Sequence, residues 1–549
     1  MTSSRNQALT VHQAIARSLS ENGVATLFGL MGDANMYLVN SFIRDCGGRF
    51  IAAAHEAGAT MMALGYAALA DTPGVCSVTH GPGMTNTITG LVEGVKGSLP
   101  LVMICGDTDV VDLENPQNVS QREFVVDAGA GFEQLRSPRT VAQDVARVLK
   151  RAMVEHRPIV LNVPLDLDWK SAEDYKPVHV RIPESRATVS SSDDLDTAIG
   201  IIATAKRPII LAGRGATSAA ARQSILTLAK RIDAPVMTTL KAKDLFRGEE
   251  FNLGICGTVS TPLTVDTVLE SDCLVSFGAS LNKYTMSHGA FLKGKRVIQI
   301  NVEPSEVGKN VDVSAGLVGD PAAVADLIVH WLDEAEVAPS GFRTGELKEK
   351  IAATVPTAST GADHGDGTVD YRQALWQLDQ ILPQDRVLVT DGGRFMVEAW
   401  KNLGVSGPRS FLTTINFASI GLGLSHGIGA SYAAPGRPVV VVCGDGGFMH
   451  GGLSEFNTAV RHKIDLIVLV CNDGAYGAEH FKFLNRQMNP DAILFEWPDL
   501  APVAIALGGE GITIRSQNDW KEAAEAIGRR SKPLLIDIKL DPYRVPWDR

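Results

Sequence analysis

The stretch 438–477 constrains the fold more than any other part of this chain, because it holds two apolar runs that each end in a glycine-containing turn. The first run, 439–443, leads into the turn 444–447, and the second run, 464–471, leads into the turn 472–474. Uninterrupted β-branched runs are typical of buried strands in a parallel sheet, and a helix must cross between such strands. We therefore expect two neighbouring strands whose carboxyl ends lie together, where open α/β sheets bind ligands.

The polar residues of these two turns indicate a metal site. Asp445 follows the first run and Asn472 follows the second, 27 positions later, so both are expected at the same edge of the sheet. Carboxylate, amide and backbone carbonyl oxygens suit Mg²⁺, which is usually held by few protein groups together with phosphates. The glycines let the backbone approach a diphosphate closely. An ordinary βαβ unit with a glycine turn is the alternative interpretation.

The layout resembles the cofactor motif of thiamine-diphosphate-dependent enzymes, in which Gly-Asp-Gly is followed further along the chain by Asn. The resemblance implies that Asp445, Asn472 and the carbonyl of Gly474 hold Mg²⁺. It also implies that the diphosphate lies against the turn formed by Gly444, Asp445, Gly446 and Gly447. The family usually has Asn-Asn where this chain has Cys471 and Asn472, and the second residue is the metal ligand.

The rest of the sequence repeats the alternation of short apolar runs and helical patterns that is typical of α/β domains with parallel sheets. A length of 549 residues is enough for about three or four domains. Two polar stretches, 176–194 and 337–369, read as linkers. We therefore predict three doubly wound parallel-sheet domains, at 1–175 (pyrimidine-binding), 195–336 (central) and 370–549 (diphosphate-binding).

Charge, apolar runs and cysteines limit the partners and the compartment. The net charge is −11 and no Lys/Arg-rich run occurs, so we expect no nucleic-acid partner. No apolar stretch reaches the ~18–20 residues that would span a membrane, so no membrane role is expected. The seven cysteines are dispersed without a CxxC pair, and the first residues carry no apolar signal core. Free thiols of this kind predict a reducing compartment, the cytoplasm.

The first third resembles the pyrimidine-binding domain of the same family in three motifs, Phe-Gly-x-x-Gly at 28–32, His-Glu-x-x-Ala at 55–59, and the Gly-Pro-Gly loop at 81–86. The resemblance implies that Glu56 hydrogen-bonds N1′ of the cofactor's aminopyrimidine. This contact favours the tautomer whose nitrogen takes the C2 proton, so Glu56 counts as both catalytic and cofactor-binding. The protein then supplies orientation and electrostatics, and the cofactor supplies the electron sink. Without the other motifs, Glu56 reads as an ordinary acidic residue at a helix start.

The last third opens with a short apolar run, 387–390, that leads into Gly392 and Gly393, which we expect to bind the cofactor. The segment 417–423 resembles the part of the family in which a large apolar residue lies beneath the cofactor and forces its V shape. Ile420 matches that residue. The alternative is that Ile420 is an ordinary core residue.

The central third holds a Gly-Arg-Gly turn, 213–215, directly after the apolar run 208–212. Such a turn can cradle a nucleotide phosphate, or it can be purely structural. In the family this domain carries FAD in acetohydroxyacid synthases and pyruvate oxidases, ADP or CoA in some lyases, and nothing in others. The residues leave the choice among FAD, ADP/CoA and no ligand open.

These motifs occur in the family's order over nearly the whole chain, which is identified as a member of the thiamine-diphosphate-dependent enzymes of the acetolactate synthase and pyruvate decarboxylase type. Membership implies that a small 2-oxo acid is decarboxylated, that the resulting carbanion is ligated to a second carbonyl, or both. It also implies a homodimer or homotetramer, because the glutamate of one subunit reaches the cofactor held by another.

Three other activities stay open. One is a lyase that cleaves a 2-hydroxyacyl or 2-hydroxyketone compound, CoA esters included, and another is a simple 2-oxo acid decarboxylase. The third is an inactive regulatory homologue, which is disfavoured because Glu56, Asp445 and Asn472 are all present.

Three residues are candidates for catalytic contact with the substrate. His80 heads the glycine loop and either contacts the substrate or caps the loop. Gln121 loosely matches a glutamine that faces the substrate in acetohydroxyacid synthases, although this chain reads Gln-Arg-Glu where the family reads Gln-Glu. Glu479 falls, with one residue inserted, where pyruvate-decarboxylase-like enzymes carry a catalytic glutamate. A carboxyl group there could handle a proton, and a solvated helix glutamate is the alternative.

Overall fold

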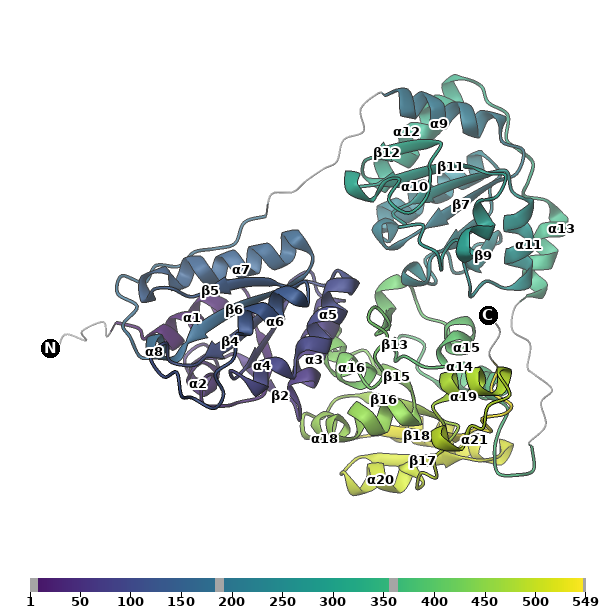
Figure 1. The fold of residues 1–549 in the computed structure, drawn as a ribbon. Coiled ribbons are helices and arrows are strands. Elements are labelled where there is room, and N and C mark those ends of the chain that lie inside the picture. Colours follow the sequence, from purple (N-terminus) through teal and green to yellow (C-terminus); the bar gives the residue numbers. More distant parts are fainter. Residues whose placement is uncertain (1–7, 183–191, 355–363, 547–549) are drawn as a thin grey trace.

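Three sheets organise the molecule, one in each third of the chain (Figure 1). The computed structural model describes residues 8–182, 192–354 and 364–546. Each sheet has six strands, and neighbouring strands pair in parallel throughout. Separate hydrophobic clusters lie against the two faces of the sheets, so helices cover both sides. The predicted α/β class with three doubly wound parallel-sheet domains is confirmed.

The first domain has the strand order β2-β1-β3-β4-β6-β5. Its strands are β1 (Thr26–Gly29), β2 (Arg49–Ala52), β3 (Gly74–Val78), β4 (Leu101–Asp107), β5 (Gly131–Gln134) and β6 (Pro158–Pro164). Its helices are α1 (Val11–Glu21), α2 (Met36–Arg44), α3 (Glu56–Ala67), α4 (Pro82–Thr85), α5 (Ile88–Gly97), α6 (Gln121–Asp127), α7 (Val141–Glu155) and α8 (Leu165–Asp168).

The central domain has the strand order β12-β11-β10-β7-β8-β9. Its strands are β7 (Pro208–Ala212), β8 (Val236–Thr238), β9 (Asn252–Ile255), β10 (Cys273–Phe277), β11 (Arg296–Asn301) and β12 (Ala315–Val318). Its helices are α9 (Asp193–Thr204), α10 (Ala219–Arg231), α11 (Pro262–Glu270), α12 (Pro321–Glu334) and α13 (Gly345–Ala353).

The last domain has the strand order β14-β13-β15-β16-β18-β17, which repeats the pattern of the first domain. Its strands are β13 (Val387–Thr390), β14 (Phe411–Thr413), β15 (Val439–Gly444), β16 (Leu466–Asn472), β17 (Glu510–Ile514) and β18 (Leu534–Lys539). Its helices are α14 (Tyr371–Ile381), α15 (Met396–Asn402), α16 (Gly423–Ala433), α17 (Asp445–Gly447), α18 (Leu453–Arg461), α19 (Gly477–Asn485), α20 (Leu500–Ala506) and α21 (Trp520–Arg529).

Strands β15 and β16 are neighbours in register, from Val439 opposite Leu466 to Gly444 opposite Cys471. Both strands are buried along almost their whole length, as their uninterrupted apolar sequences require. Their carboxyl ends therefore lie side by side, as predicted. The strands that precede β15 along the chain lie on one side of it and those that follow lie on the other, so the switch point of the sheet is between β13 and β15, at this same carboxyl edge.

The first and last domains pack against each other through helices α3 and α16, which lie side by side in the centre of Figure 1. Glycines allow the two backbones to approach very closely. A Cβ on Gly65 would lie 2.0 Å from the His426 carbonyl oxygen, and a Cβ on Gly429 would lie 1.7 Å from that of Met62. One hydrophobic cluster accordingly contains residues of both domains.

The second predicted linker, 337–369, is wrong in part, because α13 lies within it. Thr344 caps this helix by accepting a hydrogen bond from the Leu347 N–H, and Ile351 packs against the core of the central domain. An amphipathic turn within a polar stretch escaped a prediction based on composition. The segments 183–191 and 355–363 of the two predicted linkers lie outside the described residues.

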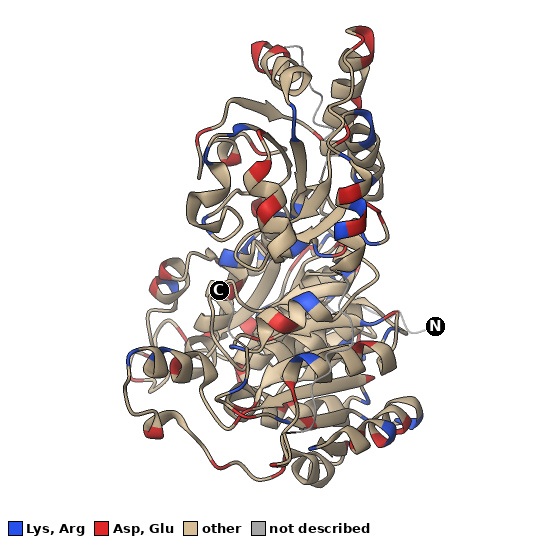
Figure 2. Ribbon diagram, turned by 90° about the vertical axis from the view of Figure 1, so that its right-hand side faces the viewer, with Lys and Arg blue, Asp and Glu red and all other residues tan. Residues whose placement is uncertain are grey.

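Charged residues of both signs are interspersed along the helices in the view of Figure 2. No helix in the described ranges combines the length and the apolar character that crossing a bilayer requires. All seven cysteines lie in the described ranges and are unpaired.

Candidate active site

A cavity of about 2260 Å³ opens where the three domains meet, and residues of all three line it. Much of the predicted cofactor site lines it, namely Gly392, Gly393, Ile420, Gly444, Asp445, Gly446, Gly447 and Glu479. These residues come from the ends of β13 and β15 and from the segments that follow β14 and β16. The cavity thus coincides with the switch point of the last sheet.

The turn at 444–447 requires glycine because its backbone is closely surrounded. A Cβ on Gly446 would lie 2.8 Å from the Tyr476 ring, and a Cβ on Gly447 would lie 2.8 Å from Asp391 Oδ2. The turn opens a continuous helical segment made of α17, a π-helical turn η7 (Phe448–Gly452), and α18. Backbone N–H groups at such a start are available to an anion.

The candidate metal ligands fit a divalent cation. Asp445 is buried, and its Oδ2 has no hydrogen-bond partner among the described residues. Burial raises the pKa of Asp445 to about 6, while the N–H groups of Gly446 and Gly474 favour the ionised carboxylate. Asn472 donates its Nδ2 to Asp537 Oδ1 at 2.8 Å, which fixes the amide and leaves Oδ1 as the atom available to a cation. The Gly474 carbonyl accepts from the Phe495 N–H at 2.7 Å and keeps one lone pair.

Asp473 is a second carboxylate in the cavity wall that the sequence reading left out of the site. Burial and the neighbouring charge of Asp445 raise the pKa of Asp473 to about 8, against the opposing effect of Arg394. Two neighbouring carboxylates in each other's field are what a bound divalent cation would compensate. The position of Asp473 between Asn472 and Gly474 was a signal that could have placed it in the predicted site.

Ile420 lies against the glycine turns of the cavity. Its side-chain carbons are 3.8 Å from the Cβ positions of Gly392 and of Gly447. The loop that carries it is held by Asp391, which accepts from the N–H groups of Gly421 at 2.7 Å and Leu422 at 3.3 Å. This position suits a side chain that supports a bound ligand from the side of the two glycine turns.

Glu479 lines the cavity in the first turn of α19, and its side chain is 51% exposed. Its Oε1 accepts from Lys482 Nζ at 3.2 Å. The carboxylate therefore faces the cavity while it forms a partly solvated ion pair on its own helix.

Glu56 begins α3 in the first domain and is buried. Its Oε2 accepts from Asn86 Nδ2 at 3.0 Å, so two of the quoted motifs are in contact. Among the described residues that line the cavity, Glu56, His80 and Gln121 do not appear. One chain thus presents the predicted pyrimidine-side and diphosphate-side residues in different places.

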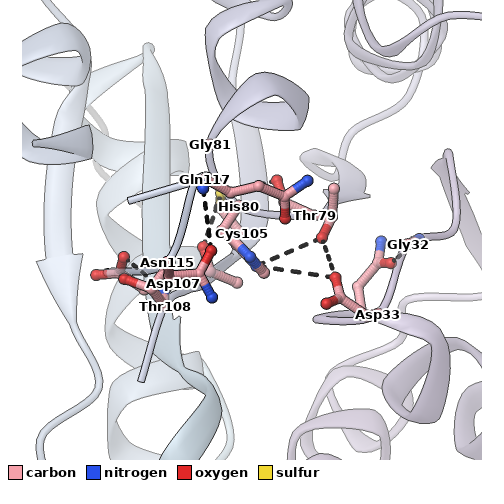
Figure 3. Close-up of polar contacts among 12 residues, drawn as sticks. Gly32, Asp33, Thr79, His80, Gly81, Cys105, Asp107, Thr108, Asn115 and Gln117 are labelled. Carbon is pink, nitrogen blue, oxygen red and sulfur yellow. Dashed lines mark hydrogen bonds and ion pairs between the residues drawn. The ribbon is translucent and has the colours of Figure 1, made fainter. Parts of the chain in front are cut away.

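His80 lies at the end of β3 beside Asp33, which follows β1 (Figure 3). His80 Nδ1 is 4.0 Å from Asp33 Oδ1 and 3.5 Å from Thr79 Oγ1, and Thr79 donates to Asp33 at 3.0 Å. His80 is buried, and its Nε2 finds no partner in the part of the chain that the structure describes. Asp33 was not among the site residues predicted from the sequence, although its place after a strand at the switch point of this sheet was a usable signal.

Gln121 has its whole amide engaged within the first domain. Its Oε1 accepts from the Gly81 N–H at 2.9 Å, and its Nε2 donates to the Gly106 carbonyl at 2.8 Å and to Asn162 Oδ1 at 2.7 Å. In this chain Gln121 braces the glycine loop, and its contact with substrate stays a prediction.

The fold and the cavity define an enzyme of the thiamine pyrophosphate (thiamine diphosphate) class, and comparison with known families agrees. The N-terminal TPP binding domain of thiamine pyrophosphate enzymes matches residues 9–129, the central domain matches 195–328, and the C-terminal TPP binding domain matches 391–538. The chain belongs to the thiamine pyrophosphate enzyme family.

Curated relatives of different activities resemble the chain over nearly its whole length. A sulfoacetaldehyde acetyltransferase of Alcaligenes xylosoxydans xylosoxydans is 28% identical, over 98% of this chain and 94% of that protein. An acetolactate synthase of Arthrospira platensis is 27% identical, over 96% and 93%. A probable 2-ketoarginine decarboxylase of Pseudomonas aeruginosa is also 27% identical, over 94% and 91%. The recognised family is confirmed, and these relatives include transferases, synthases and decarboxylases.

Proposed function

We propose that this protein is a thiamine-diphosphate- and Mg²⁺-dependent, acetolactate-synthase-like enzyme that decarboxylates a 2-oxo acid and ligates the remaining fragment to a second carbonyl. The observation that carries the proposal is the buried Asp445 oxygen without a partner, beside Gly474 and on the glycine turn. When bound, thiamine diphosphate supplies the carbon nucleophile and the electron sink for this chemistry.

The residues divide the work in the proposed site. Asp445, Asn472 and the Gly474 carbonyl hold the metal, and the turn 444–447 binds the diphosphate. Ile420 supports the cofactor from below, with Gly392 and Gly393 beside it. Glu56 holds the aminopyrimidine in the proton-accepting tautomer, and His80 and Glu479 contact the substrate. The cavity wall and the orientation of Asn472 by Asp537 support this division.

Mass spectrometry of products tests the reaction. The holoenzyme should be incubated with pyruvate and with 2-ketoarginine, each with and without sulfoacetaldehyde or a second 2-oxo acid as acceptor, because three relatives are named for these chemistries. Release of CO₂ with a ligated product supports the proposal. CO₂ with an aldehyde alone identifies a simple decarboxylase, and no turnover of any 2-oxo acid contradicts the proposal.

We further propose that a homodimer, alone or within a homotetramer, completes each site. Glu56 is absent from the described lining of this chain's cavity, so a Glu56 from a second chain is needed opposite Asp445. The catalytic unit then holds two equivalent sites, each built from the first domain of one chain and the last domain of the other.

The central domain favours a nucleotide-containing ligand as a second candidate feature. Its strand order reverses between β7 and β10, and the turn 213–215 lies there, with a Cβ on Gly213 only 2.3 Å from the Gly278 carbonyl oxygen. Arg214, Lys241 and Lys309 line the adjoining cavity, and burial lowers the pKa of Lys241 to about 8. Heating the purified protein and identifying what it releases distinguishes FAD from ADP or CoA. A released CoA ester would favour the lyase alternative.

A further inference from the structure

A carboxylate of the last domain binds the backbone directly before Glu56. Glu455, on α18, is buried, and its Oε1 accepts from the N–H groups of Ala54 and His55 at 3.1 Å each. Its Oε2 is 3.2 Å from the Ala54 nitrogen, so both carboxylate oxygens take part. Hydrogen bonds to an ionised acceptor are about twice as strong as neutral ones. This contact therefore fixes the entry of the chain into α3.

The sequence of α3 makes room for this carboxylate. A Cβ on Gly58 would lie 2.1 Å from Glu455 Oε1, so glycine at this position is what allows the approach. The backbone of Gly58 is helical, and glycine in a helix otherwise costs about 1 kcal/mol relative to alanine. The helix loses propensity at the position where the Glu455 carboxylate approaches, which indicates that this contact between domains has a functional role.

The two ends of α3 are held by opposite charges from the same domain. Glu455 binds N–H groups at the N-terminal end, and Arg409 donates to the Leu69 carbonyl just beyond the C-terminal end and pairs with Asp71. Both signs complement the helix dipole. The two contacts are thus matched in kind, but only the one at Glu455 adjoins Glu56.

Glu455 also belongs to the helical segment that begins with the diphosphate turn. This segment runs from Asp445 through α17 and η7 into α18. Arg461 in the last turn of α18 donates to the Ala52 carbonyl at 2.9 Å, so the same helix holds the end of β2 as well. The element that presents Asp445 to one site therefore fixes the backbone that presents Glu56.

We propose that Glu455 is a positioning residue for Glu56: its carboxylate holds the N–H groups of Ala54 and His55 and so fixes the direction of the Glu56 side chain toward the cofactor's aminopyrimidine. The inference rests on the proposed function of Glu56. It assigns to Glu455 no contact with cofactor or substrate, and it links, within one chain, the parts that this chain contributes to two different sites.

Amide hydrogen exchange of the apoenzyme tests the contact without the cofactor. In Glu455→Gln, the peptide that contains Ala54 and His55 should exchange about tenfold faster than in the wild type, since a charged acceptor is replaced by a neutral one. Arg409→Ala is the matched control, because it removes a contact between the same two domains at the other end of α3. It should leave the exchange of this peptide unchanged. Equal acceleration in both variants would mean loosened domain packing only and would overturn the inference.

Exchange of the C2 proton of bound thiamine diphosphate for deuterium tests the role. With Mg²⁺ and saturating cofactor, Glu455→Gln should slow this exchange by about 10- to 100-fold, while its affinity for the cofactor stays within about twofold. Gly58→Ala should do the same, because the added methyl group displaces the carboxylate while alanine preserves the helix. Arg409→Ala should retain the wild-type rate. Gly58→Ala keeps the test decisive if Glu455→Gln does not fold.

The outcomes separate this inference from the proposed function. A wild-type enzyme that does not accelerate C2 exchange over free cofactor overturns both. The positioning role alone is overturned if the wild type accelerates C2 exchange and Glu56→Gln does not, while Glu455→Gln and Gly58→Ala both keep the wild-type rate. A loss of cofactor affinity as large as the loss of exchange also overturns it, because Glu455 would then act on the diphosphate turn.

Discussion

Glu56 is the residue on which the rate should depend most, because it is buried at the start of α3 with its carboxylate held by Asn86. Glu56→Gln should keep the fold and the affinity for thiamine diphosphate but lower kcat by about 10²–10⁴-fold, the range of a positioned proton-transfer group. The amide cannot share a proton with N1′ in the same way. Steady-state kinetics and calorimetric titration of the cofactor measure the two quantities.

The control for Glu56 is Glu123→Gln, which changes an exposed glutamate of the same domain on α6. It should leave kcat within about twofold, as surface substitutions usually do. If Glu56→Gln were equally harmless, the pyrimidine-side assignment would be lost.

Substitution of Glu479 tests whether this residue is an acid–base group or an ordinary surface glutamate. If it transfers a proton in the reaction, Glu479→Gln should lower kcat and kcat/KM together, by about 10²–10⁴-fold, and should raise the ratio of ligated product to aldehyde. Lys482→Ala is the matched control, because it removes the ion pair and keeps the carboxyl group. Equal small effects of both variants would make Glu479 a solvated helix residue.

Residues that belong to one local motif could be predicted from the sequence, and residues that act across the fold could not. The glycine turn with Asp445 and the strand end with Asn472 follow from two apolar runs and their turns. Glu455 touches residues about 400 positions away, and nothing in its own neighbourhood indicates a partner there. Asp33 directly follows the motif 28–32 and Asp473 lies within the turn 472–474, but their significance depends on His80 and Asp445 being adjacent in space.

At the scale of elements, the contact between α3 and α16 should be highly sensitive to side-chain size. Gly429→Ala puts a methyl group 1.7 Å from the Met62 carbonyl oxygen, so the helices must separate. We expect a loss of about 1–3 kcal/mol in the free energy of unfolding, the usual cost of overpacking. Denaturant unfolding followed by circular dichroism measures it.

Gly200→Ala is the control for this contact, because Gly200 lies in α9 with open space around its Cβ position. Alanine there should be neutral or stabilising by up to about 1 kcal/mol, the difference in helix propensity. If both substitutions had the same effect, the close helix contact would carry no stability of its own.

Elements were predicted best where burial imposes a long apolar run, as in β15 and β16. The helix α13 was missed because only Leu347 and Ile351 mark its apolar side. Composition describes a stretch as a whole and does not resolve one short amphipathic turn within it.

At the scale of the whole molecule, the alternation of apolar runs and helical patterns predicted three parallel-sheet domains, but it could not predict how the domains dock. Docking depends on glycines whose partners are backbone atoms of another domain. The cavity where the three domains meet is likewise a product of docking and leaves no local signature. The separation of Glu56 from that cavity is the feature that bears most on assembly.

This separation predicts that the active species is larger than one chain. Analytical ultracentrifugation with cofactor and Mg²⁺ should give at least twice the 58.6 kDa of the chain, and activity should fall on dilution below the dissociation constant of the dimer. Mixing Glu56→Gln with Asp445→Ala subunits should restore about half of the wild-type activity in each mixed dimer, and about a quarter over a random mixture, because one of the two sites in a mixed dimer keeps both residues. An active 58.6 kDa species would contradict the shared site.

The most direct test of the whole account is calorimetric titration of the purified protein with thiamine diphosphate, with Mg²⁺ and with EDTA, for the wild type, Asp445→Ala and the exposed control Asp491→Asn. We expect tight binding by the wild type and the control only when Mg²⁺ is present. We also expect Asp445→Ala to lose at least about 100-fold in affinity, because removing one partner of a buried charge costs about 3–5 kcal/mol. Binding that is equally tight in EDTA, or that Asp445→Ala leaves unchanged, would contradict the account.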